Sequence, residues 1–141
     1  MKRLLFITFL VLMMPIHAYA FNFHGVKSGM TKEEIEKTME ALGAKNNKYD
    51  ESKWEEFKSI GFPPVFAILK FDHNGKLLEM QLFYSTYKLP STAIEALKHV
   101  LKSKFKATML DLDNSIGVIL VDASLMKRDI EFYKQLFLKE L

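Results

Sequence analysis

Four oxygen-bearing side chains near the end of the sequence have the spacing of a calcium-binding loop. Asp111, Asp113, Ser115 and Asp122 occupy the first, third, fifth and twelfth positions of an EF-hand-like loop, whose oxygen ligands hold Ca²⁺. The sixth position of such a loop requires glycine for a sharp turn, and here it is Ile116. The apolar residues 116–121 are typical of a β-strand. We therefore interpret the segment as a polar hairpin turn and predict no metal site.

The histidines and the clustered glutamates show no catalytic or metal-binding pattern either. The histidines that follow residue 20 do not have a spacing such as H-E-x-x-H, which places two zinc ligands on one helix face (His24, His73 and His99). The glutamates of residues 33–40 are interleaved with Lys32 and Lys37, which is typical of a solvated helix face. Paired carboxylates act as acid and base only where a pocket separates their pKa values. We predict no catalytic residue from either group.

Composition excludes several other classes of function. The chain has no cysteine, so it has no disulfide, thiolate metal site or cysteine nucleophile. It also lacks a G-x-S-x-G elbow and a glycine-rich phosphate loop, and we expect no cofactor. Nearly equal numbers of basic and acidic residues argue against nucleic acid as a partner. A lysine-rich segment favours a solubilising face over an anionic partner surface (residues 98, 102, 104 and 106).

Residues 1–20 have the pattern of a cleavable secretory signal peptide. Lys2 and Arg3 precede the apolar run 4–14, and Pro15 ends it. Ala18 and Ala20 supply the small residues that a signal peptidase reads, so cleavage is expected after Ala20. The apolar run is about half the roughly twenty residues that a membrane-spanning helix needs. We therefore predict export to the periplasm or the medium without a transmembrane anchor.

The remaining residues, 21–141, predict a single small domain of alternating helices and hairpins. Thr31 and Glu34 form a capping box that opens a helix, and Gly43 closes it. Residues 44–64 are compatible with a short helix or with a strand. Residues 65–84 predict a hairpin with a turn at 72–75, and Gly75 is suited to positive φ there.

The second half predicts the same order of elements. Pro90, Ser91 and Thr92 open a helix, in which Thr92 and Glu95 have the spacing of a second capping box. Residues 107–121 predict another hairpin, whose return strand is apolar throughout and is expected inside the sheet. Ser124 is expected to cap a last helix that ends at Leu141. Its main apolar stripe has helical spacing (Met126, Ile130, Tyr133, Phe137 and Leu141) and is widened by four further apolar residues (Leu125, Phe132, Leu136 and Leu138).

These elements predict an α+β fold. We expect an antiparallel sheet of about four strands, formed by the two hairpins, with three helices packed on one face. The absence of a linker or a low-complexity segment favours one domain over residues 21–141.

Aromatic residues are more numerous than a small core needs. Exposed aromatic patches mark interaction sites, so the surplus points to contacts with a partner. The candidate contacts are Trp54, Phe57, Tyr87, Phe132 and Leu136. The wide apolar surface of the last helix is the most favourable place for a partner or for self-association.

Two segments resemble the small SmpA/OmlA-type (BamE-like) outer-membrane-assembly proteins and the related β-lactamase-inhibitor-like modules. The run Gly29-Met30-Thr31-Lys32-Glu33-Glu34-Ile35, with Gly43 closing the helix, is similar to their opening helix. Phe71-Asp72, Asn74-Gly75 and Leu77 are similar to a hairpin of those modules. The resemblance implies two helices on an antiparallel sheet and an exported binding module. A lipobox cysteine is absent, and no functional residue carries over from the family.

These observations together favour a binding protein of the bacterial envelope that performs no chemistry itself. Its partner is expected to be another envelope protein or a second copy of the chain. Two alternatives remain: a hydrolase-type enzyme with a cryptic carboxylate or histidine site, and a carrier of a lipid-like ligand held between the sheet and the last helix. An enzyme predicts a polar cleft, and a carrier predicts an apolar cavity of several hundred Å³.

Overall fold

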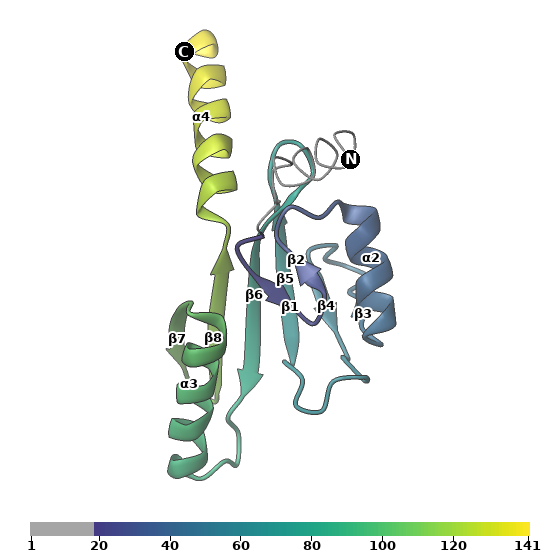
Figure 1. Cartoon of the computed structure of the whole chain (residues 1–141), viewed down its shortest axis with the longest axis vertical. Coiled ribbons are helices and arrows are strands. Elements are labelled where there is room, and N and C mark those ends of the chain that lie inside the picture. Colours follow the sequence, from purple (N-terminus) through teal and green to yellow (C-terminus); the bar gives the residue numbers. More distant parts are fainter. Residues whose placement is uncertain (1–18) are drawn as a thin grey trace, which may run out of the picture.

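The computed structural model describes residues 19–141, so the predicted signal peptide lies outside the described residues except for Tyr19 and Ala20. The described elements, in chain order, are β1 (Asn22–Phe23), β2 (Val26–Lys27), α2 (Lys32–Ala41), β3 (Lys45–Asn46), β4 (Lys53–Glu55), β5 (Phe66–Phe71), β6 (Leu77–Ser85), α3 (Ser91–Phe105), β7 (Thr108–Leu112), β8 (Ser115–Val121) and α4 (Ala123–Glu140). They form an α+β fold, as the sequence predicts (Figure 1).

The main sheet has six strands in the order β3-β4-β5-β6-β8-β7, and every neighbouring pair is antiparallel. The expectation of about four strands is therefore wrong. The two additional strands come from residues 44–64, where β3 and β4 are only two and three residues long. Such short strands leave almost no alternating pattern, which is why the sequence left this segment open. A separate two-stranded sheet joins β1 and β2.

Both long hairpins form where the sequence predicts them. Between β5 and β6, Gly75 has φ +74°, and the Asp72 carboxylate accepts hydrogen bonds from the backbone N–H groups of Asn74 and Lys76. Between β7 and β8, Asn114 takes the left-handed conformation with φ +59°. Strand β8 pairs with β6 on one side and with β7 on the other, which confirms its predicted interior position.

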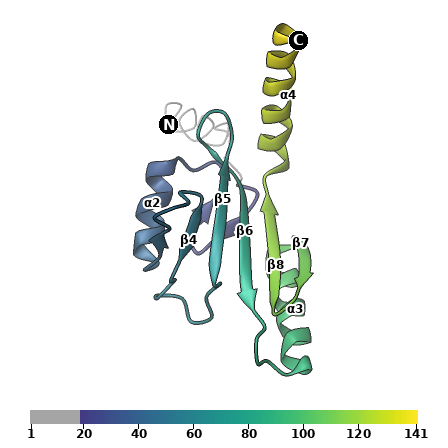
Figure 2. The ribbon, with the colours of Figure 1, turned by 180° about the vertical axis from the view of Figure 1, so that it is seen from behind.

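The hydrophobic core lies on one face of the sheet. Met80, Leu82 and Val118 are fully buried there. Phe23 and Val26 of the β1–β2 lead-in, the inner side of α2 and Leu101 of α3 cover these residues. Figures 1 and 2 show α2, α3 and the lead-in on the same side of the sheet, while the opposite face carries no helix. Two helices, rather than the expected three, therefore pack on the sheet.

The helix caps agree with the sequence at one of three positions. Thr31 caps α2 by accepting a hydrogen bond from the backbone N–H of Glu34 at 3.3 Å, and Gly43 follows with φ +72°. Helix α3 begins after Pro90 without a side-chain cap, so the capping box expected at Thr92 does not form. Helix α4 is capped by Asp122 rather than by Ser124, because β8 runs directly into the helix.

Helix α4 departs most from the sequence-based expectation. It has no buried residue and extends away from the rest of the molecule along the longest axis (Figures 1 and 2). The space predicted between the sheet and the last helix therefore has no counterpart in residues 19–141. Among the described helices, none combines the length and the hydrophobicity needed to cross a bilayer.

Candidate interaction surface

The first turns of α4 are fixed to the body of the protein at two points. Asp122, at the end of β8, donates its backbone N–H to the carbonyl of Leu78 at 2.9 Å, and its carboxylate accepts the N–H of Leu125 at 3.1 Å. Asp122 is buried, so this cap is protected from water. The helix thus begins at a defined residue with a defined direction.

The second point is a contact between α4 and the β5–β6 turn, which we call the His73 clasp. One carboxylate oxygen of Asp129 lies 2.8 Å from the backbone nitrogen of His73 and 2.7 Å from its Nδ1. The His73 ring also stacks on Phe132, with ring centroids 3.8 Å apart and parallel planes. Both side chains of the polar pair are mostly shielded from solvent. Hydrogen bonds from the side chain and then the backbone of His73 hold the pKa of Asp129 below its usual value.

Beyond the His73 clasp, α4 makes no buried contact. Every residue from Ile130 to Leu141 is exposed. Among them are seven large apolar side chains, each at least two-fifths exposed, which we call the α4 apolar surface: Ile130, Phe132, Tyr133, Leu136, Phe137, Leu138 and Leu141. This surface is wider than the stripe of a helix that packs on one sheet face.

The α4 apolar surface is as large as the apolar patches that often mark interaction sites. An aromatic side chain carries on the order of 150–250 Å², so the seven side chains together present several hundred Å². The largest apolar patch of a typical monomer is roughly 300–600 Å² and is often functional. One partner of a standard protein interface contributes about 800 Å². The surface therefore approaches the size of one side of an interface.

The charges of α4 are nearly balanced, with four basic and three acidic side chains. Lys127, Arg128, Lys134 and Lys139 are matched by Asp129, Glu131 and Glu140, and Glu131 also accepts a hydrogen bond from Gln135 at 3.0 Å. An amphipathic helix that binds anionic membranes normally carries a strongly basic polar face. The balance on α4 gives little electrostatic attraction of that kind and leaves apolar contact as the principal driving force.

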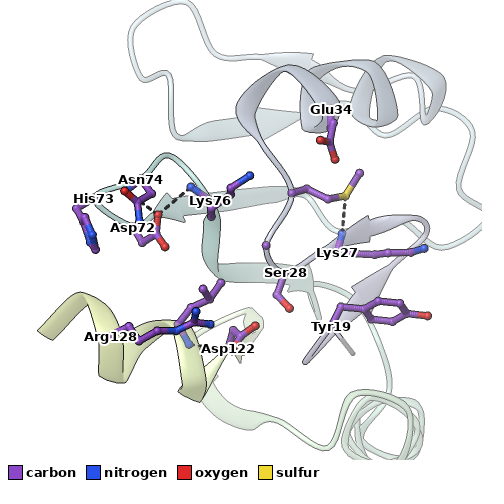
Figure 3. Close-up of a pocket in the computed structure, with 13 residues that line it drawn as sticks. Tyr19, Lys27, Ser28, Glu34, Asp72, His73, Asn74, Lys76, Asp122 and Arg128 are labelled. Carbon is purple, nitrogen blue, oxygen red and sulfur yellow. Dashed lines mark hydrogen bonds between the residues drawn. The ribbon is translucent and has the colours of Figure 1, made fainter. Parts of the chain in front are cut away.

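A polar cavity of about 640 Å³ lies at the base of α4 (Figure 3). Asp122 and Arg128 line it from α4, Asp72 and His73 from the β5–β6 turn, and Lys27 from the lead-in. The Asp72 carboxylate accepts backbone hydrogen bonds within the β5–β6 turn, and the Asp122 carboxylate caps α4. These two carboxylates therefore have structural roles, whereas the third carboxylate that lines the cavity, Glu34 of α2, is exposed.

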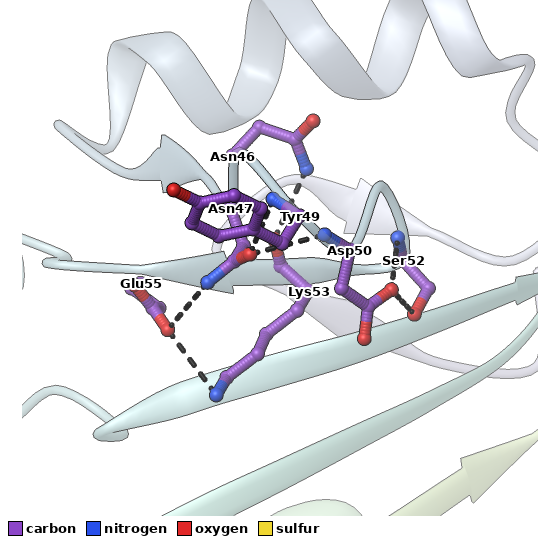
Figure 4. Close-up of polar contacts among 7 residues, drawn as sticks. All are labelled: Asn46, Asn47, Tyr49, Asp50, Ser52, Lys53 and Glu55. Atoms are coloured by element: carbon purple, nitrogen blue, oxygen red, sulfur yellow. Dashed lines mark hydrogen bonds and ion pairs between the residues drawn. The ribbon is translucent and has the colours of Figure 1, made fainter.

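A second cluster of polar contacts lies in the loop between β3 and β4 (Figure 4). Asn47 accepts the N–H groups of Tyr49 and Asp50, and Asp50 accepts both the hydroxyl of Ser52, at 2.6 Å, and its N–H. These hydrogen bonds lower the pKa of Asp50. The cluster is exposed and shapes the loop, and it contains no nucleophile–base pair.

The residues that the sequence proposed as partner contacts are not gathered in one place. Trp54 and Phe57 are 7% and 2% exposed and belong to the core, so a surface position for them is wrong. The burial of Trp54 follows from the strand at residues 53–55, which turns this side chain toward the core face of the sheet. Tyr87 is exposed between β6 and α3, whereas Phe132 and Leu136 lie on the α4 apolar surface.

The remaining candidates are dispersed. No group of three or more possible metal ligands occurs within residues 19–141, and Asp111 instead pairs with Lys98 at 2.7 Å. The hydrogen bond with Asp111 raises the pKa of Lys98. His24 and His99 are exposed and lie on different elements. The His73 clasp was missed by the sequence analysis because its partners are 56 positions apart and match no motif.

Comparisons with protein-family models, with curated proteins and with solved structures found no match to this chain.

Proposed function

We propose that this protein is exported, loses residues 1–20 and acts in the periplasm or the medium as a binding protein without chemistry of its own. The observation that carries the proposal is the α4 apolar surface, which the fold holds away from the core and leaves uncovered. The partner is another envelope protein or a second copy of the chain. The resemblance to SmpA/OmlA-type modules agrees with such a role and remains part of the proposal.

Energetics support a partner for α4. Most helical stability in proteins comes from the packing of an apolar face rather than from propensity, and from Ile130 to Leu141 the α4 helix has no buried residue. Covering about 500 Å² of apolar area on α4, together with a similar area on the partner, gains on the order of 25 kcal/mol, which exceeds the roughly 4–15 kcal/mol cost of association. A partner that covers the α4 apolar surface thus supplies enough free energy for a specific complex.

The test uses residues 21–141 and the double substitution Ile130→Glu/Phe137→Glu. The unsubstituted protein is expected to capture a partner from envelope extract or to elute as an oligomer, and the double variant is expected to do neither. Val100→Glu is the matched control, because Val100 is exposed on α3 and lies outside α4. Equal melting temperatures would show that all three proteins fold. A monomeric protein that captures nothing, or capture that survives the double substitution, would contradict the proposal.

Export is tested separately by the mass of the protein recovered from the periplasmic fraction of a bacterial host. We expect a chain that begins at Phe21. Material that retains Met1 and remains in the cytosol would overturn both the compartment and the class of partner.

The enzyme alternative has two observations in its favour, the cavity of about 640 Å³ at the base of α4 and the pairing of His73 with Asp129 beside it. A carboxylate that orients a histidine through Nδ1, as Asp129 does for His73, is the arrangement used in catalytic triads. The His73 ring is stacked on Phe132, however, and Asp129 also accepts a hydrogen bond from the backbone N–H of His73. The pair therefore connects α4 to the β5–β6 turn. Hydrolysis of p-nitrophenyl acetate by the wild-type protein is expected to equal that by His73→Asn, and loss of activity in this variant would favour the enzyme.

A further inference from the structure

A second uncovered apolar surface lies on the face of the main sheet opposite the core. Five apolar side chains of β5, β6, β7 and β8 form it, and we call them the sheet patch: Phe66, Ile68, Phe83, Leu110 and Ile119. They alternate along their strands with the buried core residues and are partly or fully open to solvent. Figure 2, which shows the molecule from behind, shows no helix over this face.

The sheet patch is continuous from Phe66 through Phe83 to Leu110, whereas Gln81 lies between Ile68 and Ile119. The rings of Phe66 and Phe83 are stacked, with centroids 4.5 Å apart. Gly117 lies between β6 and β7, and a Cβ atom at this position would be 3.4 Å from both Phe83 and Leu110. Because Gly117 has no side chain, the side chains of Phe83 and Leu110 occupy the space above it. The result is a broad apolar area on which a helix can lie.

Charges next to the sheet patch are paired within the sheet. Lys70 and Glu79 are 3.4 Å apart, and Lys53 and Glu55 are 3.2 Å apart. Lys53 also lies 4.6 Å from the centre of the Phe66 ring. The sheet patch therefore has no excess of one charge, which matches the balanced charge of α4. Neither surface selects a strongly acidic or strongly basic partner.

The chain cannot bring its own two apolar surfaces together in this conformation. Helix α4 begins one residue after β8, and the Asp122 cap and the His73 clasp fix its direction away from the sheet. Ile130 and Phe137 lie about a quarter turn or more around the helix from Asp129 and Phe132, so they do not face the β5–β6 turn. A helix surface and a sheet surface are thus both exposed on one chain.

We propose that two copies of this chain pair in solution, with the α4 apolar surface of each copy lying on the sheet patch of the other. This inference rests on the proposed function and identifies the partner as a second copy. Two-fold symmetry makes the contact occur twice and closes the assembly, so that no surface is left to propagate a fibre. Each sheet then has helices on both faces, which is a stable layered arrangement. Two such contacts together reach the area of a standard interface.

The experiment uses sedimentation equilibrium of residues 21–141 at 1–100 µM. The unsubstituted protein is expected to be a dimer. Ile130→Glu/Phe137→Glu on α4 and Leu110→Glu on the sheet patch are each expected to raise the dimer dissociation constant at least tenfold. Val100→Glu should leave it unchanged. Melting temperatures confirm that each variant is folded.

Mixing the two defective variants distinguishes this arrangement from other modes of association. The mixture retains one intact contact, between α4 of the Leu110→Glu chain and the sheet patch of the α4 variant, so heterodimers are expected at concentrations where each variant alone is monomeric. Absence of heterodimers, or a Leu110→Glu protein that dimerises normally, would overturn the proposal. If the unsubstituted protein is monomeric at 100 µM but its α4 surface still captures another protein, the self-pairing is wrong and the proposed function stands.

Discussion

The carboxylate of Asp129 illustrates how a single side chain determines the position of a whole helix. It accepts two hydrogen bonds from His73, and the aromatic ring of Phe132 packs against the same histidine. No other contact in residues 19–141 joins the β5–β6 turn to α4 by both polar and aromatic groups. The His73 clasp therefore has a measurable dependence on the charge of Asp129.

We expect Asp129 to make stability sensitive to acid. Its pKa in the folded protein lies below the ordinary value of 3.8, so the ionised carboxylate stabilises the folded state above that value. This contribution is lost as pH falls through the lowered pKa. The free energy of unfolding should therefore decline more steeply between about pH 5 and pH 2 in the wild type than in Asp129→Asn.

Urea unfolding at several pH values measures this difference. Asp129→Asn is expected to lose on the order of 1 kcal/mol at pH 7. Asp113→Asn, at an exposed turn position, serves as the control for a carboxylate without this contact. Parallel pH profiles of the wild type and Asp129→Asn would show that the His73 clasp contributes nothing to stability.

Thr31 and Thr92 test how far capping chemistry can be read from sequence. Both precede a glutamate by three positions, but only Thr31 accepts a hydrogen bond at a helix start. Thr31→Ala should destabilise the protein by about 1 kcal/mol, whereas Thr92→Ala should have almost no effect because Thr92 lies inside α3. Thermal melting measures both, and equal losses would contradict the assigned helix start.

At the scale of elements, the sequence predicts the type of each long segment but not its neighbours. The spacing of Ile35 and Met39 predicted α2, and Gly75 predicted the β5–β6 turn, because the helix and the turn both depend on local backbone chemistry. The apolar stripe of α4 has the same spacing whether it packs on a sheet of its own chain or on another molecule. Periodicity therefore identified the helix and several of its surface residues, such as Phe132, but could not show that the surface is uncovered.

Removal of residues 130–141 separates stability from interaction. The core contains no residue of α4, so the shortened chain should melt within a few degrees of residues 21–141. It should also lose partner capture and dimer formation. A large fall in the melting temperature, measured on dilute, monomeric protein, would show that residues 130–141 contribute to the stability of the folded chain. The control is the unshortened chain of residues 21–141.

The start of α4 can be tested in the same way. Asp122→Ala removes the observed cap and should cost about 1–2 kcal/mol, because the carboxylate is buried and accepts the N–H of Leu125. Ser124→Ala, at the cap position expected from the sequence, should be almost neutral. Urea unfolding of the two variants provides the comparison, and the reverse order of stability would place the helix start at Ser124.

At the scale of the whole molecule, residues of the lead-in, α2, α3 and the main sheet share one hydrophobic core. The sequence left residues 44–64 open between a helix and a strand, because the strand Lys53–Glu55 forms only by pairing with the longer β5 and Lys45–Asn46 forms only by pairing with β4. Trp54 was assigned to the surface for the same reason. Long-range pairing of this kind leaves no periodic signal within so few residues.

A chain that begins at Phe21 should be as stable as one that begins at Tyr19. Tyr19 and Ala20 are exposed. The Lys27 ammonium lies 4.8 Å from the centre of the Tyr19 ring, and the backbone N–H of Ala20 donates a hydrogen bond to the Ser28 hydroxyl. Phe21 and Phe23, in contrast, are buried. Melting of chains starting at residues 19, 21 and 24 should show loss of stability only for the third. A loss on removal of Tyr19 and Ala20 would argue against cleavage after Ala20.

The direct passage from β8 into α4 has a mechanical consequence. Strand β8 is paired over seven residues with β6 and over five with β7, so it is anchored on both edges. Tension applied to the far end of the helix passes into β8 along its axis and loads both ladders in shear, where the hydrogen bonds share the force instead of opening one after another. Anything attached to α4 is thereby tethered to a strand that is hydrogen-bonded along both of its edges.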